Sequence, residues 1–130
     1  VNITIHAGEG DGVSSIIDAL NNGAMRIGHG VRIIEDIKDG IIGPTASKII
    51  DLQIPLEICI TSNIHTNMYE SYEAHPITSL IDYGFNVYLN TDNRLMSNTS
   101  ISKEIEIAKS LGISDVDRLL KYSASDSFFN

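Results

Sequence analysis

Residues 5–9 read IHAGE, and this stretch joins the end of a short apolar run to the glycine-rich segment GEGDG at residues 8–12. The apolar run, VNITIH at 1–6, has the composition of a strand, and the glycines after it are typical of a turn. A histidine and a glutamate three positions apart therefore stand where a strand ends. They are either two solvated side chains of a turn, or a metal ligand beside an acid catalyst.

Three further runs resemble this first strand. They are MRIGH at 25–29, PLEICI at 55–60 and NVYLNT at 86–91. The four runs begin 24, 30 and 31 residues apart, which is the length of one β/α unit. They are nearly continuous in apolar residues, as parallel strands covered by helices tend to be. The sequence therefore predicts an α/β fold with about four parallel strands.

Helical patterns fill the intervals between these runs. Helices are expected over 13–22, 45–52, 75–83 and 100–112, and a last one over 114–120. Asp11 is a candidate cap for the first helix, Pro44 suits a first turn, and Ser100 is a candidate start for the fourth helix. In parallel sheets with such connections, ligands bind beyond the carboxyl ends of the strands. Any chemistry should therefore lie at the strand ends.

The composition restricts the classes of function. A chain of 130 residues forms one domain at most, and 42% hydrophobic with 20% charged residues is ordinary for a globular protein. No apolar run approaches the roughly 18 residues of a membrane span, so we expect a cytoplasmic protein without a membrane segment. A net charge of −8 argues against a nucleic acid polymer as partner. The single cysteine, Cys59, excludes a multi-cysteine zinc site.

Polar residues follow all four expected strands. They are His6 and Glu9 after the first run, His29 at the end of the second, Ser62, Asn63 and His65 after the third, and Asp92 and Asn93 after the fourth. A lone histidine in such a place is more often structural than a ligand. Equivalent positions of parallel strands converge on one small volume, however, so the coincidence favours a shared site. Gly28 and Gly30 would let another group approach the His29 imidazole closely.

Five ordered motifs carry a resemblance to a known family. They are HAGE at 6–9, RIGHG at 26–30, LEICITSN at 56–63, HP at 75–76 and LNTDNRLMS at 89–97. In order and separation they resemble successive motifs in the second half of the zinc-dependent (β/α)8 barrel of the adenosine deaminase family. The resemblance covers nearly the whole chain. It implies that residues 1–130 are the C-terminal half of a TIM-type barrel.

The resemblance also implies roles for the polar residues at the strand ends. His6 resembles the family's third zinc-binding histidine, and Asp92 resembles its zinc-binding aspartate. Glu9 matches the acid that passes a proton to the purine N1. His29 matches the histidine that orients or deprotonates the water on zinc. The implied reaction is hydrolytic deamination of adenosine, or a related 6-aminopurine, to inosine and ammonia.

Two further residues resemble substrate-binding positions of the family. Gly8 falls where family members bring backbone close to the purine. Asn93 falls where many members carry a second aspartate that faces the purine N7. That nitrogen is only an acceptor, and an amide offers a donor at every pH, so Asn93 is compatible with purine binding. The implied partner is a small-molecule purine nucleoside.

The chain departs from the family pattern at the metal site. The family takes two more zinc ligands from a His-x-His pair, and none occurs in this sequence. The remaining histidines, His65 and His75, are expected to be a surface loop residue and a helix cap. A full barrel needs roughly 250 residues, so residues 1–130 are expected to be a partial domain whose N-terminal half is missing and whose zinc site is incomplete. The isolated chain is expected to be inactive.

The unpaired edges of the expected sheet suggest a partner, and two alternative functions stay open. Half a barrel leaves two unpaired strand edges, so the chain should self-associate or pair with a missing N-terminal half. It could instead be a catalytically inactive scaffold or oligomerising module. The segment GEGDG could cradle a phosphate at a helix N-terminus, although it matches neither established glycine-rich phosphate motif.

Overall fold

The computed structural model describes residues 2–91 and 100–120. Within them, four strands form a parallel sheet in the order β1-β2-β5-β6. The strands are β1 Thr4–Ala7, β2 Arg26–His29, β5 Leu56–Ile58 and β6 Val87–Leu89. Each of the four apolar runs overlaps one of them, so the predicted α/β fold with a parallel sheet is confirmed.

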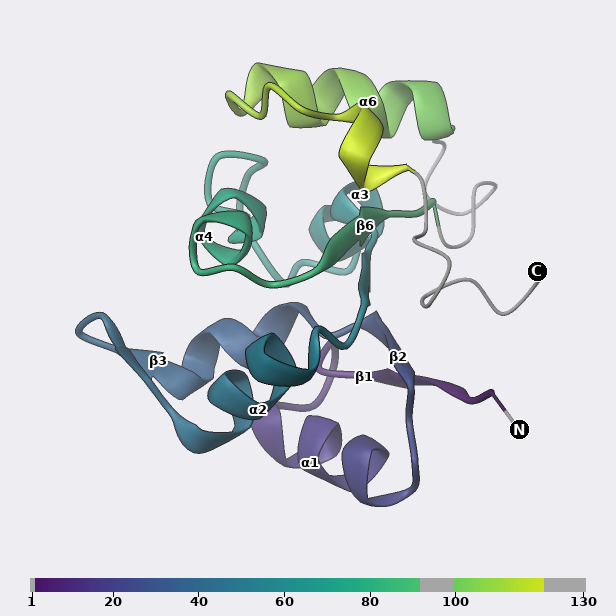
Figure 1. The fold of residues 1–130 in the computed structure, drawn as a ribbon. Helices are drawn as coiled ribbons and strands as arrows, with labels where there is room; N and C mark the ends of the chain where they lie inside the picture. Colours follow the sequence, from purple (N-terminus) through teal and green to yellow (C-terminus); the bar gives the residue numbers. More distant parts are fainter. Residues whose placement is uncertain (1, 92–99, 121–130) are drawn as a thin grey trace.

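Helices connect the strands, and four of the five expected helices are confirmed. They are α1 Val13–Asn21, α2 Pro44–Leu52, α4 Ile77–Asp82 and α6 Ile101–Ser110. Helix α1 packs on β1 and α6 packs on β6 (Figure 1). Ser100 caps α6, because its hydroxyl accepts a hydrogen bond from the backbone N–H of Lys103 at 3.3 Å. The cap position of α1 is Gly12 and not Asp11, and no side chain caps this helix.

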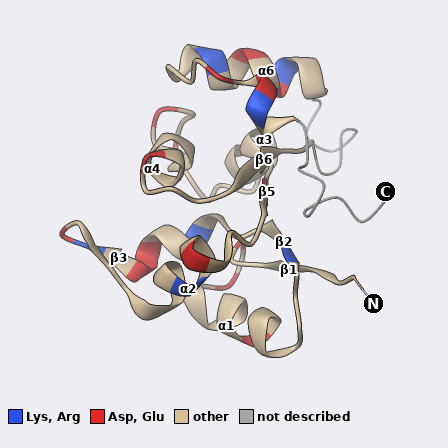
Figure 2. Cartoon of the chain, viewed as in Figure 1, with Lys and Arg blue, Asp and Glu red and all other residues tan. Residues whose placement is uncertain are grey.

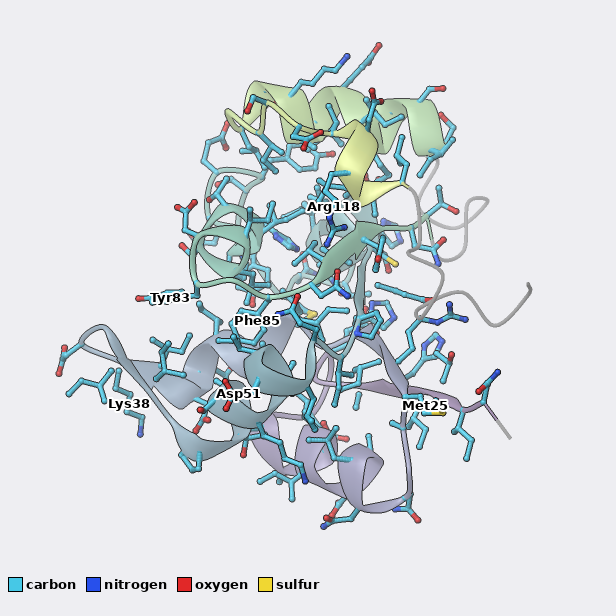
Figure 3. All side chains as sticks on the ribbon, viewed as in Figure 1. Met25, Lys38, Asp51, Tyr83, Phe85 and Arg118 are labelled. Carbon is cyan, nitrogen blue, oxygen red and sulfur yellow. The ribbon has the colours of Figure 1, made fainter. Side chains whose placement is uncertain are left out.

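The prediction of a last helix over residues 114–120 is wrong in both the type and the length of the element. Only Asp117–Leu119 form a short 3-10 turn, η2. The Asp115 carboxylate accepts from the backbone N–H of Arg118 at 3.4 Å, which is a local alternative to a helical hydrogen bond. Arg118 then reaches the sheet, where it donates to Asn86 at 2.6 Å and lies 5.1 Å from the centre of the Tyr88 ring (Figure 3). These contacts hold η2 against β6.

Four elements of the described residues lie outside the predicted pattern. They are the 3-10 helix η1 Val31–Asp36, the antiparallel hairpin β3 Ile37–Lys38 with β4 Ile41–Ile42, and the helix α3 Ile60–His65. The third apolar run was expected to be a strand as far as Ile60, but β5 ends at Ile58. A short apolar run does not distinguish a strand from the start of a buried helix. Helix α3 matters for function because it carries Asn63.

The core lies between the sheet and its covering helices. Its largest fully buried side chains include Ile27 of β2, Leu56 of β5 and Tyr88 of β6. The two outer strands of the described sheet differ in burial. All three residues of β6 are buried, whereas three of the four residues of β1 are half-buried or exposed. Among the described residues, β1 and β6 each pair with a strand on one side only, so β1 offers an edge for further pairing.

Basic and acidic residues are interspersed over the described elements (Figure 2). Arg26 pairs with Glu57 across β2 and β5, with 2.7 Å between Nε and Oε1. Arg32 and Glu35 form another pair at 2.7 Å. None of the helices in the described ranges has the length and apolar character that a membrane crossing requires.

Candidate functional site

Strands β1 and β2 bring three of the predicted site residues together. The parallel register places His6 opposite Gly28 and Ala7 opposite His29. Glu9 follows β1 by two residues and returns to the same end of the sheet. His6, Glu9 and His29 line one cavity of about 150 Å³. The prediction that strand ends gather polar side chains at one place is therefore confirmed for these three.

His6 lies across the neighbouring strand. Its ring meets the ring of His29 edge-on, with 5.2 Å between centroids and 74° between planes. A β-carbon added at Gly28 would come within 2.7 Å of Cδ2 of His6. Gly28 therefore makes room for the His6 ring, and the approach to His29 predicted from the flanking glycines is made by His6. The His6 side chain remains exposed, so its nitrogen can take a ligand from solvent.

His29 and Glu9 are in direct contact. Nε2 of His29 lies 3.2 Å from Oε2 of Glu9, and the two side chains are 2% and 28% exposed. His29 has a φ of 67°, which is uncommon for a residue other than glycine, and Gly30 follows with 70°. Strained backbone of this kind persists where the surroundings hold it, and it occurs often at functional sites.

Asn63 is a neighbour of Glu9 for which no role was predicted from the sequence. Its Nδ2 donates to Oε1 of Glu9 at 3.3 Å. Its Oδ1 lies 2.8 Å from Nε2 of His75, and both side chains are buried. In the sequence the two residues belong to the separate motifs LEICITSN at 56–63 and HP at 75–76, which gave no indication that they meet.

The two remaining histidines have different environments. His75 was expected to cap a helix, but the cap position of α4 is Pro76. The Nδ1 of His75 nevertheless accepts a hydrogen bond at 3.1 Å from the backbone N–H of Ile77, the first residue of α4. His75 is only 3% exposed, and burial lowers its pKa to about 4. His65 is exposed as predicted, but it ends α3 and does not lie in a loop.

Gly8 holds the loop between β1 and α1 close to the sheet. Its φ is 68°, and an added β-carbon would lie 2.5 Å from Cδ1 of Ile16 and 3.1 Å from Cα of Gly30. Its N–H donates to the Ser15 hydroxyl at 2.9 Å. The close packing of this turn therefore requires glycine at position 8. Gly8 also lines the cavity of His6, Glu9 and His29.

A second cavity, of about 390 Å³, lies on another side of Glu9. Arg32 and Glu35 line it together with Tyr69. The Arg32 guanidinium donates to both carboxylate oxygens of Glu35, at 2.7 and 3.1 Å, and to the Gly10 carbonyl at 2.8 Å. The hydrogen bond to Glu35 raises the pKa of Arg32. Arg32 thus anchors the loop that carries Glu9.

Only part of the predicted metal site lies within the described residues. Asp92 and Asn93 lie outside the described residues. Residues 2–91 and 100–120 contain no group of three or more His, Cys, Asp or Glu side chains that could hold a metal ion. His6 offers an exposed imidazole, which suits zinc, but a zinc ion there needs ligands beyond the described part of the chain.

Several known proteins are similar to this chain. A family model described as adenosine deaminase matches residues 1–130. Adenosine deaminase 1 of Streptomyces coelicolor is 52% identical over 109 residues, which are 79% of this chain and 28% of the relative. The chain thus spans less than a third of that relative's length.

Solved structures of relatives have the same fold. An adenine deaminase from Arthrobacter aurescens superimposes with a TM-score of 0.88 and 28% identity, over 100% of this chain and 39% of that one. The N6-methyl-AMP deaminase of Arabidopsis thaliana superimposes with a TM-score of 0.70 and 32% sequence identity. The match covers 90% of this chain and 33% of that chain. An amidohydrolase from Burkholderia ambifaria with bound zinc is 20% identical and shares the fold with a TM-score of 0.76. The match covers 92% of this chain and 33% of that chain.

These neighbours are TIM-barrel amidohydrolases, of which the chain covers about a third. The four-stranded sheet is thus one part of such a barrel, as the motifs predicted. The family match extends over all 130 residues. The chain belongs to the adenosine deaminase family.

Proposed function

We propose that residues 1–130 form the C-terminal part of a zinc-dependent purine deaminase that converts adenosine, or a related 6-aminopurine, to the 6-oxopurine and ammonia. The observation that supports this most is the meeting of His6, Glu9 and His29 in one cavity at the carboxyl ends of β1 and β2. Family membership supports the reaction class. The named relatives act on adenosine, adenine or N6-methyl-AMP, which all contain a purine with a nitrogen substituent at C6.

Glu9 is proposed as the acid. Adding water to C6 of a purine destroys aromaticity, and protonation of N1 at the same time offsets part of that cost. Glu9 is half-buried, its Oε2 faces His29, and both residues line the cavity. His29 is proposed to orient the attacking water or to take its proton. The backbone at Gly8 would lie against the purine, and the Asn93 amide would hold N7.

Zinc is proposed to bind at His6 and Asp92. When bound, the ion would act as a Lewis acid that lowers the pKa of a water molecule toward neutrality. Two protein ligands hold zinc weakly compared with a complete site, so the isolated chain should bind it poorly. The missing ligands would come from an N-terminal half-barrel that pairs with this chain and covers the open edge of β1. A cytoplasmic location stays a prediction.

Reconstitution with the missing part of a relative tests the proposal. The N-terminal segment of the Streptomyces coelicolor relative, which precedes its match to this chain, is co-expressed with residues 1–130. The purified pair is assayed for zinc and for conversion of adenosine, adenine and AMP. We expect about one zinc ion per pair and turnover of at least one 6-aminopurine. A pair that forms and binds zinc but deaminates none of them would support the alternative, an inactive scaffold.

A further inference from the structure

Behind Glu9 lies a buried set of hydrogen bonds that the proposed function does not use. It begins at the first turn of α4, passes through His75 and Asn63, and ends on the carboxylate of Glu9. We propose that Asn63 and His75 are positioning residues, which hold the Glu9 carboxyl group and leave its proton on Oε2. We call the hydrogen-bonded series Ile77–His75–Asn63–Glu9 the relay. Its catalytic consequence rests on the proposed function, whereas the hydrogen bonds themselves do not.

The direction of the relay is set by a backbone amide. The N–H of Ile77 can only donate, and it points at Nδ1 of His75 at 3.1 Å. Nδ1 must therefore be the unprotonated nitrogen of a neutral imidazole. The ring proton of His75 then lies on Nε2, which faces Asn63.

The protonated Nε2 in turn fixes the Asn63 amide. It lies 2.8 Å from Oδ1 of Asn63, and only the oxygen of the amide can accept this hydrogen bond. Asn63 is 0% exposed and His75 is 3% exposed, so water does not compete for either group. The amide cannot turn over without two donors facing each other. Its NH2 group is thereby directed away from His75.

The NH2 group of Asn63 has two protons and two neighbours. One neighbour is Oε1 of Glu9 at 3.3 Å, and the other is the Met68 sulfur at 3.6 Å. Because the amide can only donate here, Oε1 serves as the acceptor. When Glu9 is protonated, its proton therefore belongs on Oε2, which is 3.2 Å from Nε2 of His29. Glu9 and His29 both line the smaller cavity. The relay thus directs the acid proton toward His29 and away from Asn63.

The surroundings of His75 keep the relay in one state. Burial lowers the pKa of His75 to about 4, so the ring stays neutral near pH 7. The Tyr69 ring lies 5.2 Å away and closes one side of the imidazole. A protonated ring would put a second N–H against the amide of Ile77, which disfavours that form further.

Two variants at one position separate positioning from simple space filling. The His75→Gln side chain keeps an oxygen for the Ile77 amide and an NH2 group for Asn63, whereas His75→Leu removes both. In the reconstituted pair, we expect His75→Leu to lower kcat about 10- to 100-fold while KM changes less than about threefold. His75→Gln should restore most of kcat. Equal losses in the two variants, or a loss that falls mainly on KM, would overturn the positioning role.

Nuclear magnetic resonance on the 130-residue chain tests the relay without any turnover. Nitrogen-15 shifts of the imidazole should show His75 as the neutral tautomer with its proton on Nε2. The Asn63 NH2 protons should exchange slowly with solvent, and His75→Leu should remove this protection while His75→Gln keeps it. A proton on Nδ1, or unprotected Asn63 signals, would overturn the relay. An inactive reconstituted pair would count against the proposed function alone, since these spectra would still decide the relay.

Discussion

At the residue scale, Glu9 is the point where the contacts of the site converge. One carboxylate oxygen faces the buried His29, and the other receives a hydrogen bond from Asn63. Arg32 anchors the loop around it through the Gly10 carbonyl. A carboxyl group contacted on both oxygens and carried by an anchored loop is suited to deliver a proton along one direction, because little motion is needed at the moment of reaction.

Glu9→Gln is therefore expected to abolish deamination while zinc stays bound. The amide keeps the size of the side chain but cannot give up a proton, and general acid catalysis is typically worth about 10²- to 10⁴-fold in rate. The measurement is kcat of the reconstituted pair together with its zinc content. If the variant retained most of its turnover, Glu9 would not be the acid.

His6→Ala is expected to remove zinc from the reconstituted pair. His6 is the one predicted ligand that lies within the described residues, and its exposed imidazole faces the cavity of Glu9 and His29. His65→Ala is the matched control, since His65 is an exposed histidine at the end of α3. Zinc is measured by elemental analysis of the purified pairs. Equal zinc in the two variants would exclude His6 as a ligand.

His75 should make the stability of the chain depend on pH. Its pKa is about 4 when folded against the ordinary 6.5, so between these values the unfolded chain binds more protons. The contribution of neutral His75 is fully present above pH 6.5 and is lost as the pH falls toward 4, by about 3 kcal/mol in total. Urea unfolding from pH 7 to 4 should show a smaller decrease for His75→Gln than for wild type. Parallel curves would contradict the buried neutral state.

The residue-scale predictions succeeded where the strand ends alone determine position. His6, Glu9 and His29 meet because parallel strands in register converge, and the sequence contains that information. The role of Asn63 could not be predicted, because it depends on α3, a helix that the apolar pattern hides. His75 was expected to be a cap, but its burial depends on packing between α3 and α4.

At the scale of elements, the pairing of β1 and β2 decides where His6 points. Gly28 lies opposite His6, and any side chain there would meet the imidazole. Gly28→Ala should therefore displace the ring and weaken zinc binding by about 10- to 100-fold, as loss of support for a ligand does. Gly10→Ala is the matched control, because a β-carbon there meets nothing within 4 Å. Zinc titration of the two pairs gives the comparison, and unchanged affinity in Gly28→Ala would contradict this account.

The helices were predictable where the spacing of apolar residues agrees with residues that typically begin or end a helix. Helix α2 begins at Pro44 and α6 begins after Ser100, as expected from their residue types. The errors occur where one local signal competes with another. The run 55–60 changes from strand to helix without a change of composition, and Asp115 replaces a helical hydrogen bond with its own carboxylate.

At the scale of the whole molecule, the sheet is an open part of a closed architecture. The outer strand β1 is mostly half-buried, and the chain spans 28% of the Streptomyces coelicolor relative and 39% of the Arthrobacter aurescens structure. The four strands carry their own periodicity and polar ends, so the sequence was sufficient to predict the fold. Of the two proposed zinc ligands, only His6 lies within the described residues, so the metal site remains part of the proposed function.

The pair should be more stable than the separate chains, because barrel closure covers the open edge of β1. Wild-type chain mixed with the N-terminal segment of the Streptomyces coelicolor relative is expected to form a one-to-one complex in sedimentation experiments. Self-association of residues 1–130 without the segment is the competing outcome, and it would indicate that a second copy covers β1. A chain that stays monomeric in both experiments would contradict the requirement for a partner.

The initial rate of ammonia release from a 6-aminopurine by the reconstituted pair is the most direct test of the central claim. The account predicts zinc-dependent release that chelation abolishes and that Glu9→Gln removes without loss of the metal. A stable, zinc-loaded pair that releases no ammonia from adenosine, adenine or AMP would contradict it.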